Sequence, residues 1–450
     1  MTENSNHSLS SLDGRYLNAT MPLREYFSEF AYLRDRVRVE LDYLLALSKN
    51  GLVRPLSKSD THLLNEISAK FSDADAEAIQ TFERQTRHDV KAIEYFLQEK
   101  LPADLIPWLH FGLTSEDINN LAQVLALRNA RDAILLPALD AVLETLQYFA
   151  LRYRSLPMLA RTHGQPAVPT TLGKEFVIYL ARLKKARDQI ASHRFEAKLT
   201  GAVGNFNALQ ATAPQVDWLK FSEDFIHQYD LESNLVTNQI LPYDNWVRYF
   251  DALRLANSIL IDFSQDVWRY ISEGYLKLAV LEKEVGSSTM PQKVNPIDFE
   301  NAEGNLGIAN ALFMHYAQKL TISRLQRDLS DSTVRRTFGT SLGHTLLAWS
   351  NLLRGMGRIA ANEEKIGEDL EAHWEVVSEG AQSILRAAGQ SDAYESLKEQ
   401  VRGRVLTEAD YKSWVDEIEV SDDVRTQLNS LRPETYIGLA ITLVERETSA

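Results

Sequence analysis

The sequence predicts an all-α protein whose central part is a bundle of long helices. Apolar residues recur at spacings of three and four over several turns, which is the period of a helix with one buried face. The clearest run is Leu253, Ala256, Leu260, Phe263, Val267 and Ile271. No series of alternating β-branched segments occurs, so a parallel sheet has nothing to be built from.

Taken in chain order, the first helix is predicted from Leu23 to about Asn50, where Gly51 follows as a typical C-terminal stop. A second is predicted from about Asp75 to Lys100, just before a proline. Further long helices are expected at about 115–136, 170–198, 297–320 and 332–360.

The length of 450 residues suggests roughly three domains at about 150 residues each. We expect an N-terminal helical domain over 1–112, a central long-helix bundle over 113–360 and a small helical C-terminal domain over 361–450. The last boundary coincides with the acidic segment ANEEKIGEDLE. Helices this long leave apolar faces that one chain does not cover, so we expect oligomerisation through a shared helical core.

Composition excludes several function classes. A net charge of −14 disfavours a nucleic-acid partner, which is held by neutralising phosphates. The absence of cysteine excludes disulfides, zinc fingers and cysteine nucleophiles. No metal-binding motif is present, so we expect no metal. No signal-peptide pattern or unbroken apolar stretch of about 20 residues is found, and we expect a cytoplasmic protein without a membrane partner.

Polar non-helical segments between the predicted helices are the candidate sites of chemistry, because long helices can contribute reactive groups only at their ends and breaks. These segments are RTHGQPAVP (161–169), TGAVGN (200–205), GSSTMPQKVNP (286–296) and SRLQRDLSDS (323–332).

The segment GSSTMPQKVNP cannot continue a helix, because its prolines remove amide donors and its glycine adds no conformational bias. Asn295 and Pro296 suit the cap and first position of the next helix, which places Lys293 just before a helix N-terminus. That combination favours an anion site. A capped surface connector explains the same residues without any function.

His163 lies in a segment that contains two prolines and a glycine, so it is expected on a rigid loop. A histidine there could donate or accept a proton near neutral pH, or simply bond to the backbone. Glu300, in the first turn after Pro296, could orient such a histidine or only complement the helix dipole.

Three further clusters are ambiguous on local grounds. Residues 87–89 interrupt the apolar stripe of a predicted helix, where a solvated face is the simpler explanation. LTSEDINN is a capping sequence in which Thr114 and Ser115 open a helix. The segment 323–336 gathers four arginines among hydroxyls, as a phosphate or dicarboxylate pocket requires.

GSSTMPQKVNP resembles the signature loop of the fumarase/aspartase superfamily, G-S-S-x-M-P-x-K-x-N-P, at every fixed position. Within that superfamily the chain is similar to the bacterial-type adenylosuccinate lyase family, because its other motifs follow in that family's order. They are DGRY (13–16), RHDVKAIEYFL (87–97), LTSEDINN (113–120), RTHGQPAVPTTLGKE (161–175) and QRDLSDS (326–332). The resemblance covers nearly the whole chain.

The resemblance implies a β-elimination that releases fumarate from adenylosuccinate, giving AMP. It also implies the same reaction on the succinylocarboxamide ribotide of purine biosynthesis, giving aminoimidazole carboxamide ribotide. Ser287 is implied as the base, His163 as the acid and Glu300 as the group that orients the histidine. Lys293 is implied as a carboxylate contact, and it is the local cation that could stabilise the serine alkoxide.

The resemblance also implies a set of substrate contacts: Arg15, Tyr16, Arg87, His88, Asp89, Thr114, Ser115, Gln239, Ser288, Asn295, Asn301, Arg327, Ser332 and Arg336. Of these, Arg15, Tyr16, Ser332 and Arg336 are similar to a nucleotide phosphate site. No cofactor is implied. Family members are homotetramers with a central helical core and active sites shared between subunits, which agrees with the surplus apolar faces.

Two alternatives compete with this assignment. Argininosuccinate lyase and fumarase share the signature loop, but Arg15 and the arginines of 324–336 favour a phosphorylated substrate. A non-catalytic helical scaffold, like the lens crystallins of this superfamily, would have no physical reason to keep a lysine among hydroxyls in a proline-bounded loop.

Overall fold

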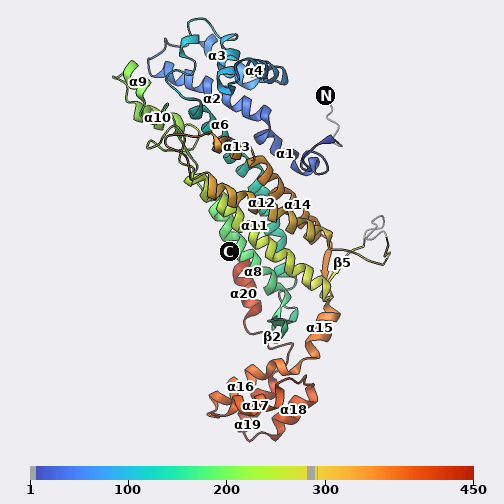
Figure 1. Ribbon diagram of the computed structural model, residues 1–450. Helices are drawn as coiled ribbons and strands as arrows, with labels where there is room; N and C mark the ends of the chain where they lie inside the picture. Colours follow the sequence, from blue (N-terminus) through green and yellow to red (C-terminus); the bar gives the residue numbers. More distant parts are fainter. Residues whose placement is uncertain (1–6, 281–288, 291, 450) are drawn as a thin grey trace. The chain divides into compact units, whose positions relative to one another are not determined.

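The computed structural model describes residues 7–280, 289–290 and 292–449. Ser287 and Ser288, predicted as base and substrate contact, lie outside these residues. The described chain is predominantly helical (Figure 1), which confirms the predicted all-α class. Its strands form only two-stranded sheets, and these small sheets were not predicted from the sequence.

The chain divides into two compact units that interleave along the sequence. The first comprises Met1–Leu139, Ala186–Ser258 and Gly304–Ser350, and the second comprises Asp140–Lys185, Ile259–Glu303 and Asn351–Ala450. The predicted three-domain division at residues 112 and 360 stays a prediction.

The elements of the first unit are α1 (Leu17–Phe27), α2 (Glu29–Lys49), α3 (Lys58–Ala69), α4 (Asp73–Thr86), α5 (Asp89–Gln98), the 3₁₀ turn η2 (Ile106–Trp108), α6 (Ser115–Ala130), the π-helical turn η3 (Arg131–Leu135), β3 (Glu196–Ala197), α9 (Asn207–Thr212), α10 (Trp218–His227), β4 (Glu232–Ser233) and α13 (Ser330–Arg335). The short strands β3 and β4 pair in parallel.

Long helices contribute residues to both units: α7 (Leu136–Arg152), α8 (Leu172–Ser192), α11 (Asp244–Ser272), α12 (Ile297–Lys319) and α14 (Phe338–Met356). The second unit adds β1 (Pro157–Thr162), β2 (Gln165–Thr171), β5 (Leu276–Leu278), β6 (Ile359–Ala361), α15 (Glu363–Glu371), η4 (Trp374–Val377), α16 (Ser378–Ala387), α17 (Ala393–Val401), α18 (Glu408–Glu417), α19 (Asp422–Ser430) and α20 (Ala440–Thr448).

The helical stripe predicted on α11 packs inward as expected. Leu253, Ala256, Leu260, Phe263 and Val267 are all buried. In the first unit, Phe250 of the same helix stacks on Phe313 with ring centroids 5.6 Å apart and also meets Phe338 at 4.8 Å. Aromatic pairs of this kind add to the free energy gained by burying apolar area.

The helix predicted from residue 23 to 50 is in fact two helices, α1 and α2. Ser28 between them is extended, with φ −74° and ψ 159°. Its hydroxyl oxygen accepts a hydrogen bond from the Ala31 N–H at 3.1 Å, so the serine caps α2. A periodic apolar pattern continues across such a break, which is why the pattern alone did not reveal it.

The helix predicted from residue 75 to 100 is also broken, and the interpretation of residues 87–89 as a solvated helix face is wrong. Arg87 ends α4 in the left-handed region with φ 54°, and His88 is extended. The His88 Nδ1 atom accepts a hydrogen bond from the Lys91 N–H at 3.2 Å and so caps α5. Arg87 and His88 therefore form a turn between two helices, and Asp89 begins the second of them.

The segment 161–169, expected to be a loop, is most of a β-hairpin. Strands β1 and β2 pair antiparallel with Thr162 opposite Gln165. His163 and Gly164 form the two-residue turn with φ values of 53° and 76°, the pair of positive values that a type I′ turn requires. Pro166 and Pro169 argued against a strand, and a two-stranded sheet tolerates them because each strand is an edge.

One described helical run, Ser115–Arg152, is long and apolar enough to cross a membrane by length and composition alone. No such segment was predicted from the sequence, because charged residues interrupt its apolar stretches while the average over the helix stays apolar. Only 33% of its apolar window is buried within the chain, so part of this helix is left uncovered by the residues that the structure describes.

The hairpin is held where α7 ends and α8 begins. Gly173, in the first turn of α8, donates its N–H to the Tyr153 carbonyl at 2.9 Å. A Cβ atom at position 173 would lie 2.4 Å from the Ala150 carbonyl oxygen and 2.5 Å from the Arg154 backbone. The glycine thus permits a backbone approach that any side chain would prevent.

We expect Gly173→Ala to lower the free energy of unfolding by about 1–3 kcal/mol, because the backbones must separate to admit the methyl group. Gly367→Ala is the matched control on helix α15, where a Cβ meets nothing within 4 Å and alanine should stabilise by up to about 1 kcal/mol. Thermal unfolding of both variants provides the measurement. Equal shifts of the two midpoints would show that close packing at Gly173 is unimportant.

Candidate active site

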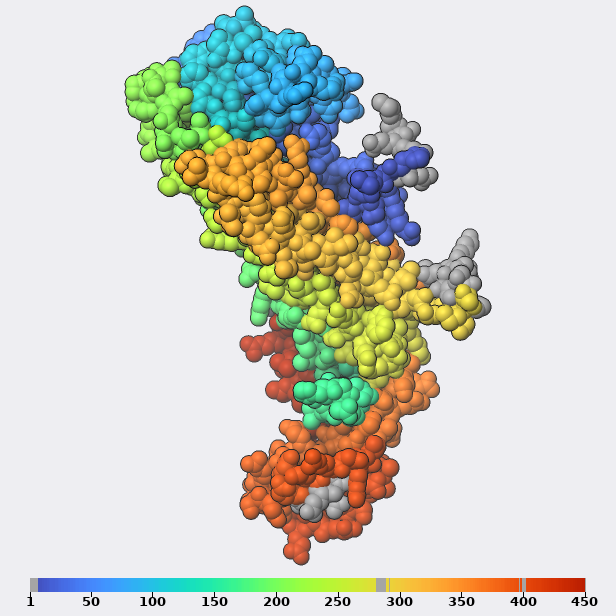
Figure 2. Space-filling model, viewed as in Figure 1, coloured from blue at the N-terminus to red at the C-terminus, as the bar shows by residue number. Residues whose placement is uncertain are grey.

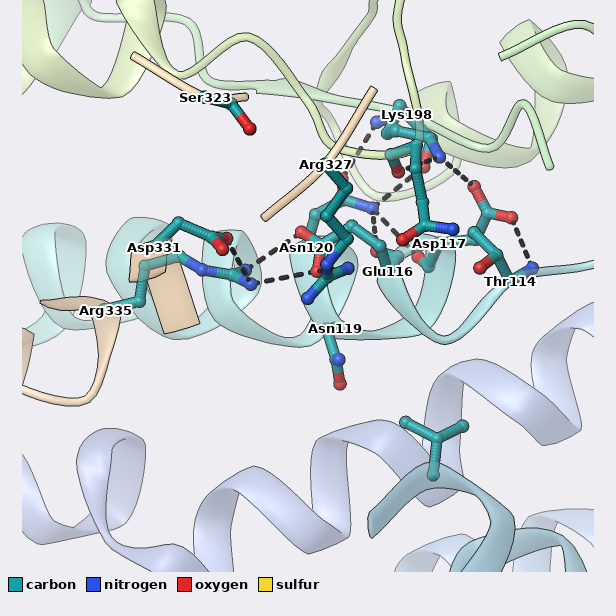
Figure 3. Close-up of polar contacts among 12 residues, drawn as sticks. Thr114, Glu116, Asp117, Asn119, Asn120, Lys198, Ser323, Arg327, Asp331 and Arg335 are labelled. Atoms are coloured by element: carbon teal, nitrogen blue, oxygen red, sulfur yellow. Dashed lines mark hydrogen bonds and ion pairs between the residues drawn. The ribbon is translucent and has the colours of Figure 1, made fainter. Parts of the chain in front are cut away.

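The first turn of α6 is the centre of a buried polar cluster in the first unit (Figure 3). Thr114 precedes the helix, and its N–H donates to Asp117 Oδ2 at 2.9 Å, which confirms the predicted capping sequence. The side chains of Glu116 and Asp117 are both 0% exposed. A buried carboxylate needs a cation and hydrogen-bond donors around it. Glu116 and Asp117 have different cations and different donors.

Asp117 is paired with a fully buried lysine. Lys198 Nζ lies 2.9 Å from Asp117 Oδ1 and also donates to the carbonyls of Gly201 at 3.2 Å and Gln239 at 2.7 Å. The Thr200 N–H donates to Asp117 Oδ1 at 3.0 Å. The pair therefore ties the start of α6 to the non-helical segment 200–205 and to the backbone of Gln239, which is a predicted substrate contact.

Glu116 is paired with two arginines. Arg335 binds it in a bidentate way, with its two terminal nitrogens 3.0 and 2.9 Å from the carboxylate oxygens, and Arg327 donates to Oε2 at 3.4 Å. The Tyr243 hydroxyl donates to Oε1 at 2.6 Å. Asp331 forms a second ion pair with Arg335 at 2.9 Å. Bidentate pairing of this kind fixes geometry as well as charge.

The electrostatics of this cluster keep Glu116 charged. Burial alone would raise its pKa, but Arg335 and the Tyr243 hydroxyl lower the pKa overall. Burial raises the pKa of Tyr243 well above its ordinary value, so its hydroxyl stays protonated and donates. Two carboxylates and two guanidiniums thus balance one another inside the first unit.

A second buried arginine joins the start of α5 to α6. Arg36 of α2 donates to Asp89 Oδ2 at 2.7 Å and to Asn119 Oδ1 at 2.8 Å. Burial by itself would raise the pKa of Asp89, and the Arg36 charge lowers it overall. The neighbouring side chains of Arg87 and His88 are exposed, so they face away from this anchor and toward solvent.

Beneath the segment that leads into Thr114 lies an acid–histidine pair. His110 Nδ1 and Glu40 Oε1 are 2.6 Å apart, and the glutamate is 0% exposed. Burial would lower the histidine pKa, but Glu40 raises it overall. His110 has φ 53° and Gly112 has φ 70°. The pair therefore anchors a tightly bent approach to α6.

Two of the residues predicted to bind phosphate, Arg15 and Tyr16, belong to the amino-terminal segment, which is dark blue at the surface in Figure 2, and Arg336 lines a cleft beside that segment. Arg336 is exposed and lies 3.6 Å from Glu29. Arg336 lines one cleft together with Ser28 and Asp13, the first residue of DGRY. Ser332 is half-buried in α13. Arg15 is exposed and lies 5.9 Å from the ring centre of Tyr16.

The second unit contains the other predicted groups. His163 is exposed at the tip of the hairpin, and the side chain of Lys293 is exposed as well. Glu300 accepts a hydrogen bond from Trp268 Nε1 at 3.1 Å in the first turn of α12. The Asn351 amide donates to Asn301 Oδ1, and Asn295 is half-buried just before the helix. The catalytic roles expected for these residues stay predictions.

Several buried residues that hold this cluster together were not predicted from the sequence. Lys198, Arg36 and Glu40 lie inside ordinary helical or irregular segments, and no local motif marks them. The one local signal is the acidic pair after Ser115. Two acids at the start of an apolar helix indicate buried carboxylates only if their partner cations are known.

Comparison with known proteins gives two family matches. Residues 14–309 match a family described as lyase, and residues 323–437 match a family described as adenylosuccinate lyase C-terminal. The chain is 42% identical over 453 residues to adenylosuccinate lyase of Legionella pneumophila, covering 99% of both chains. It is 44% identical to the enzymes of Dictyostelium discoideum, covering 96% of both chains, and Haemophilus influenzae, covering 97% of this chain and 98% of the other.

Two solved structures share the fold. The 3-carboxy-cis,cis-muconate lactonizing enzyme from Pseudomonas putida superimposes with a TM-score of 0.74 at 22% identity, covering 95% of this chain and 96% of the other. Fumarate lyase from Mesorhizobium gives a TM-score of 0.77 at 16% identity, covering 96% and 98%. At these identities the likeness concerns the fold alone.

We expect Lys198→Met to destabilise the protein by about 3–5 kcal/mol, because it leaves the Asp117 carboxylate buried without a cation. Lys220→Met is the control on the surface of α10, where the lysine is 67% exposed and pairs with Asp224 at 2.9 Å; it should change stability little. Chemical denaturation of both variants tests this. If Lys198→Met unfolds at the same denaturant concentration as wild type, the buried pair is not a structural requirement.

Proposed function

The chain belongs to the adenylosuccinate lyase family of the fumarase/aspartase superfamily, and on this premise we propose how its residues carry out the reaction. The protein is an enzyme, a lyase of purine biosynthesis that releases fumarate. The observation that carries the proposal is the match to curated adenylosuccinate lyases over the full length of the chain, together with arginines and hydroxyls gathered around α6.

β-Elimination breaks the bond between the succinyl carbon and the amine nitrogen. A base removes a proton from the neighbouring carbon, the electron pair forms the double bond of fumarate, and the nitrogen leaves with a proton from an acid. We assign the base to Ser287 and the acid to His163, with Glu300 as the orienting carboxylate. Lys293 stabilises the negative charge that develops on the substrate carboxylate in the intermediate.

The start of α6 supports a carboxylate site. Thr114 and Ser115 lie at a helix N-terminus, where backbone N–H groups and the helix dipole favour an anion. We assign Thr114, Ser115, Ser288, Lys293 and Asn295 to the substrate carboxylates. We assign Arg87, His88, Asp89, Gln239, Asn301 and Arg327 to the remaining nucleotide and succinyl contacts.

A phosphate site at Arg15, Tyr16, Ser332 and Arg336 is supported by the cleft that Arg336 shares with Asp13. Arginine and hydroxyl donors form strong charge-assisted bonds to phosphate oxygens. A phosphate site also separates this chain from superfamily members whose substrates carry no phosphate. Both adenylosuccinate and the succinylocarboxamide ribotide fit such a site, because each is a phosphorylated ribonucleotide.

A homotetramer with shared active sites is supported by apolar side chains left exposed on long helices of the first unit. Leu255 of α11 is 45% exposed, and Ile308 and Met314 of α12 are 49% and 52% exposed. An added Cβ at Gly304 or Gly307 would meet nothing within 4 Å, which leaves room for another helix to approach. Helices of this kind suit a bundle between subunits. Packing against other subunits also explains the apolar run Ser115–Arg152 without a membrane, as a cytoplasmic location requires.

Purified protein should convert adenylosuccinate to AMP and fumarate in equal amounts. The change in ultraviolet absorbance measures the reaction. Ser287→Ala and His163→Ala should each lower kcat at least about 100-fold, because each removes a proton-transfer group, while equilibrium binding of substrate changes little. His62→Ala is the matched control, since this histidine is 79% exposed on α3. Wild-type protein that releases no fumarate would refute the function, and near-normal turnover by either variant would refute its assigned role.

If each active site combines Ser287 and His163 from different subunits, mixing the two inactive variants should restore part of the wild-type activity. Subunit exchange creates some sites in which both residues are native. Exchange is verified by native mass spectrometry of tagged subunits before the assay. Proven exchange without recovered activity would contradict sites shared in this way.

A further inference from the structure

The buried ion pairs alternate along the sequence with the residues proposed to touch substrate. Glu116 follows Ser115 directly, Asp331 precedes Ser332, and Arg335 precedes Arg336. Because neighbouring residues share a backbone, each buried contact fixes the position of the substrate-binding side chain beside it. Figure 3 shows Asp331 and Arg335 beside Glu116 at the start of α6.

Arg327 differs from the other arginine of this cluster. Arg335 is 1% exposed, and both of its terminal nitrogens are engaged by Glu116, one of them also by Asp331, whereas the side chain of Arg327 is 19% exposed. Within the part of the chain that the structure describes, the only side chain that accepts from the Arg327 guanidinium is Glu116, at 3.4 Å. Its other N–H groups are available to a ligand.

The backbone at Arg327 gives little help in aiming this side chain. The segment 321–329 contains neither helix nor strand, and Leu325 has φ 50°. Its fixed point is Asp328, whose carboxylate accepts from the Arg324 N–H at 3.0 Å and the Ser330 N–H at 2.8 Å. A long arginine side chain on such a segment has many rotamers, and ordering them costs free energy.

We propose that Glu116 is a positioning residue that holds Arg327 ready for the substrate. Glu116 itself is fully buried and touches no substrate. Its carboxylate is fixed by Arg335 and the Tyr243 hydroxyl, so the oxygen that meets Arg327 has a defined place. The cost of ordering Arg327 is then met during folding rather than during substrate binding. This inference rests on the proposed function, because it requires Arg327 to contact the substrate.

A double-mutant cycle tests the proposal with wild type, Glu116→Gln, Arg327→Ala and the double variant, assayed for kcat and KM on adenylosuccinate. Glu116→Gln should raise KM roughly tenfold or more, as the loss of a charge-assisted contact does, with kcat changed less than about threefold. In the Arg327→Ala background the same substitution should have no further effect on KM. Effects that multiply across the two sites would overturn the proposal, as would an unchanged KM in Glu116→Gln.

Asp331→Asn is the matched control. Asp331 shares Arg335 with Glu116 and lies 3.3 Å from the Tyr243 hydroxyl, but it forms no hydrogen bond or ion pair with Arg327. It should lower thermal stability as Glu116→Gln does, while KM changes less than about threefold. A KM increase as large as that of Glu116→Gln would show that the whole ion-pair cluster, and not the link to Arg327, determines substrate affinity.

Tyr243→Phe provides a test in case Glu116→Gln does not fold. It removes one donor to Glu116 and keeps both arginines and both carboxylates. A KM increase of about two- to fivefold that disappears in the Arg327→Ala background supports the proposal, and an increase that persists there overturns it. Wild type that is inactive on adenylosuccinate refutes the proposed function, whereas active wild type without coupling between positions 116 and 327 refutes this inference alone.

Discussion

Two adjacent carboxylates buried at the start of one helix are the constraint on which the first unit depends. Glu116 and Asp117 cannot be charged in the interior without cations, and their own helix supplies none at that end. Lys198 comes from beyond the long helix α8, and Arg335 comes from the short helix α13. Satisfying two neighbouring acids therefore joins segments that lie about 80 and 220 residues away along the chain.

The same requirement explains why the proposed substrate contacts come from so many segments. Each cation that neutralises an acid brings with it the loop or helix end beside it, and those ends carry hydroxyls, amides and exposed arginines. Lys198 holds the carbonyl of Gln239, and Arg36 holds Asp89 against α6. The polar groups proposed to face substrate are thus positioned by contacts that lie behind them, in the dry interior where such contacts are strongest.

The sequence was sufficient for the fold class and insufficient for the helix breaks and for the buried residues that support the cluster at α6, while the residues assigned to face the substrate stay predictions. Spacing of apolar residues predicted the α11 stripe, and the capping sequence predicted Thr114. The same spacing ran through Ser28 and Arg87, because a helix break changes hydrogen bonds without changing which residues are apolar. The burial of Lys198 could not be predicted, because a buried lysine has no local sequence pattern and its partner is about 80 residues away.

The hairpin that turns at His163 and Gly164 constrains how the proposed site can diversify over time. The imidazole is held by the pairing of the two strands, with Thr162 opposite Gln165, and not by packing around the ring itself. Inserting or deleting a single residue would reverse the faces of one strand and move the histidine away from its position. Side chains along the strands can be exchanged one at a time, but the length of the hairpin cannot. Related sequences are therefore expected to differ in the identity of residues in this hairpin and not in its length.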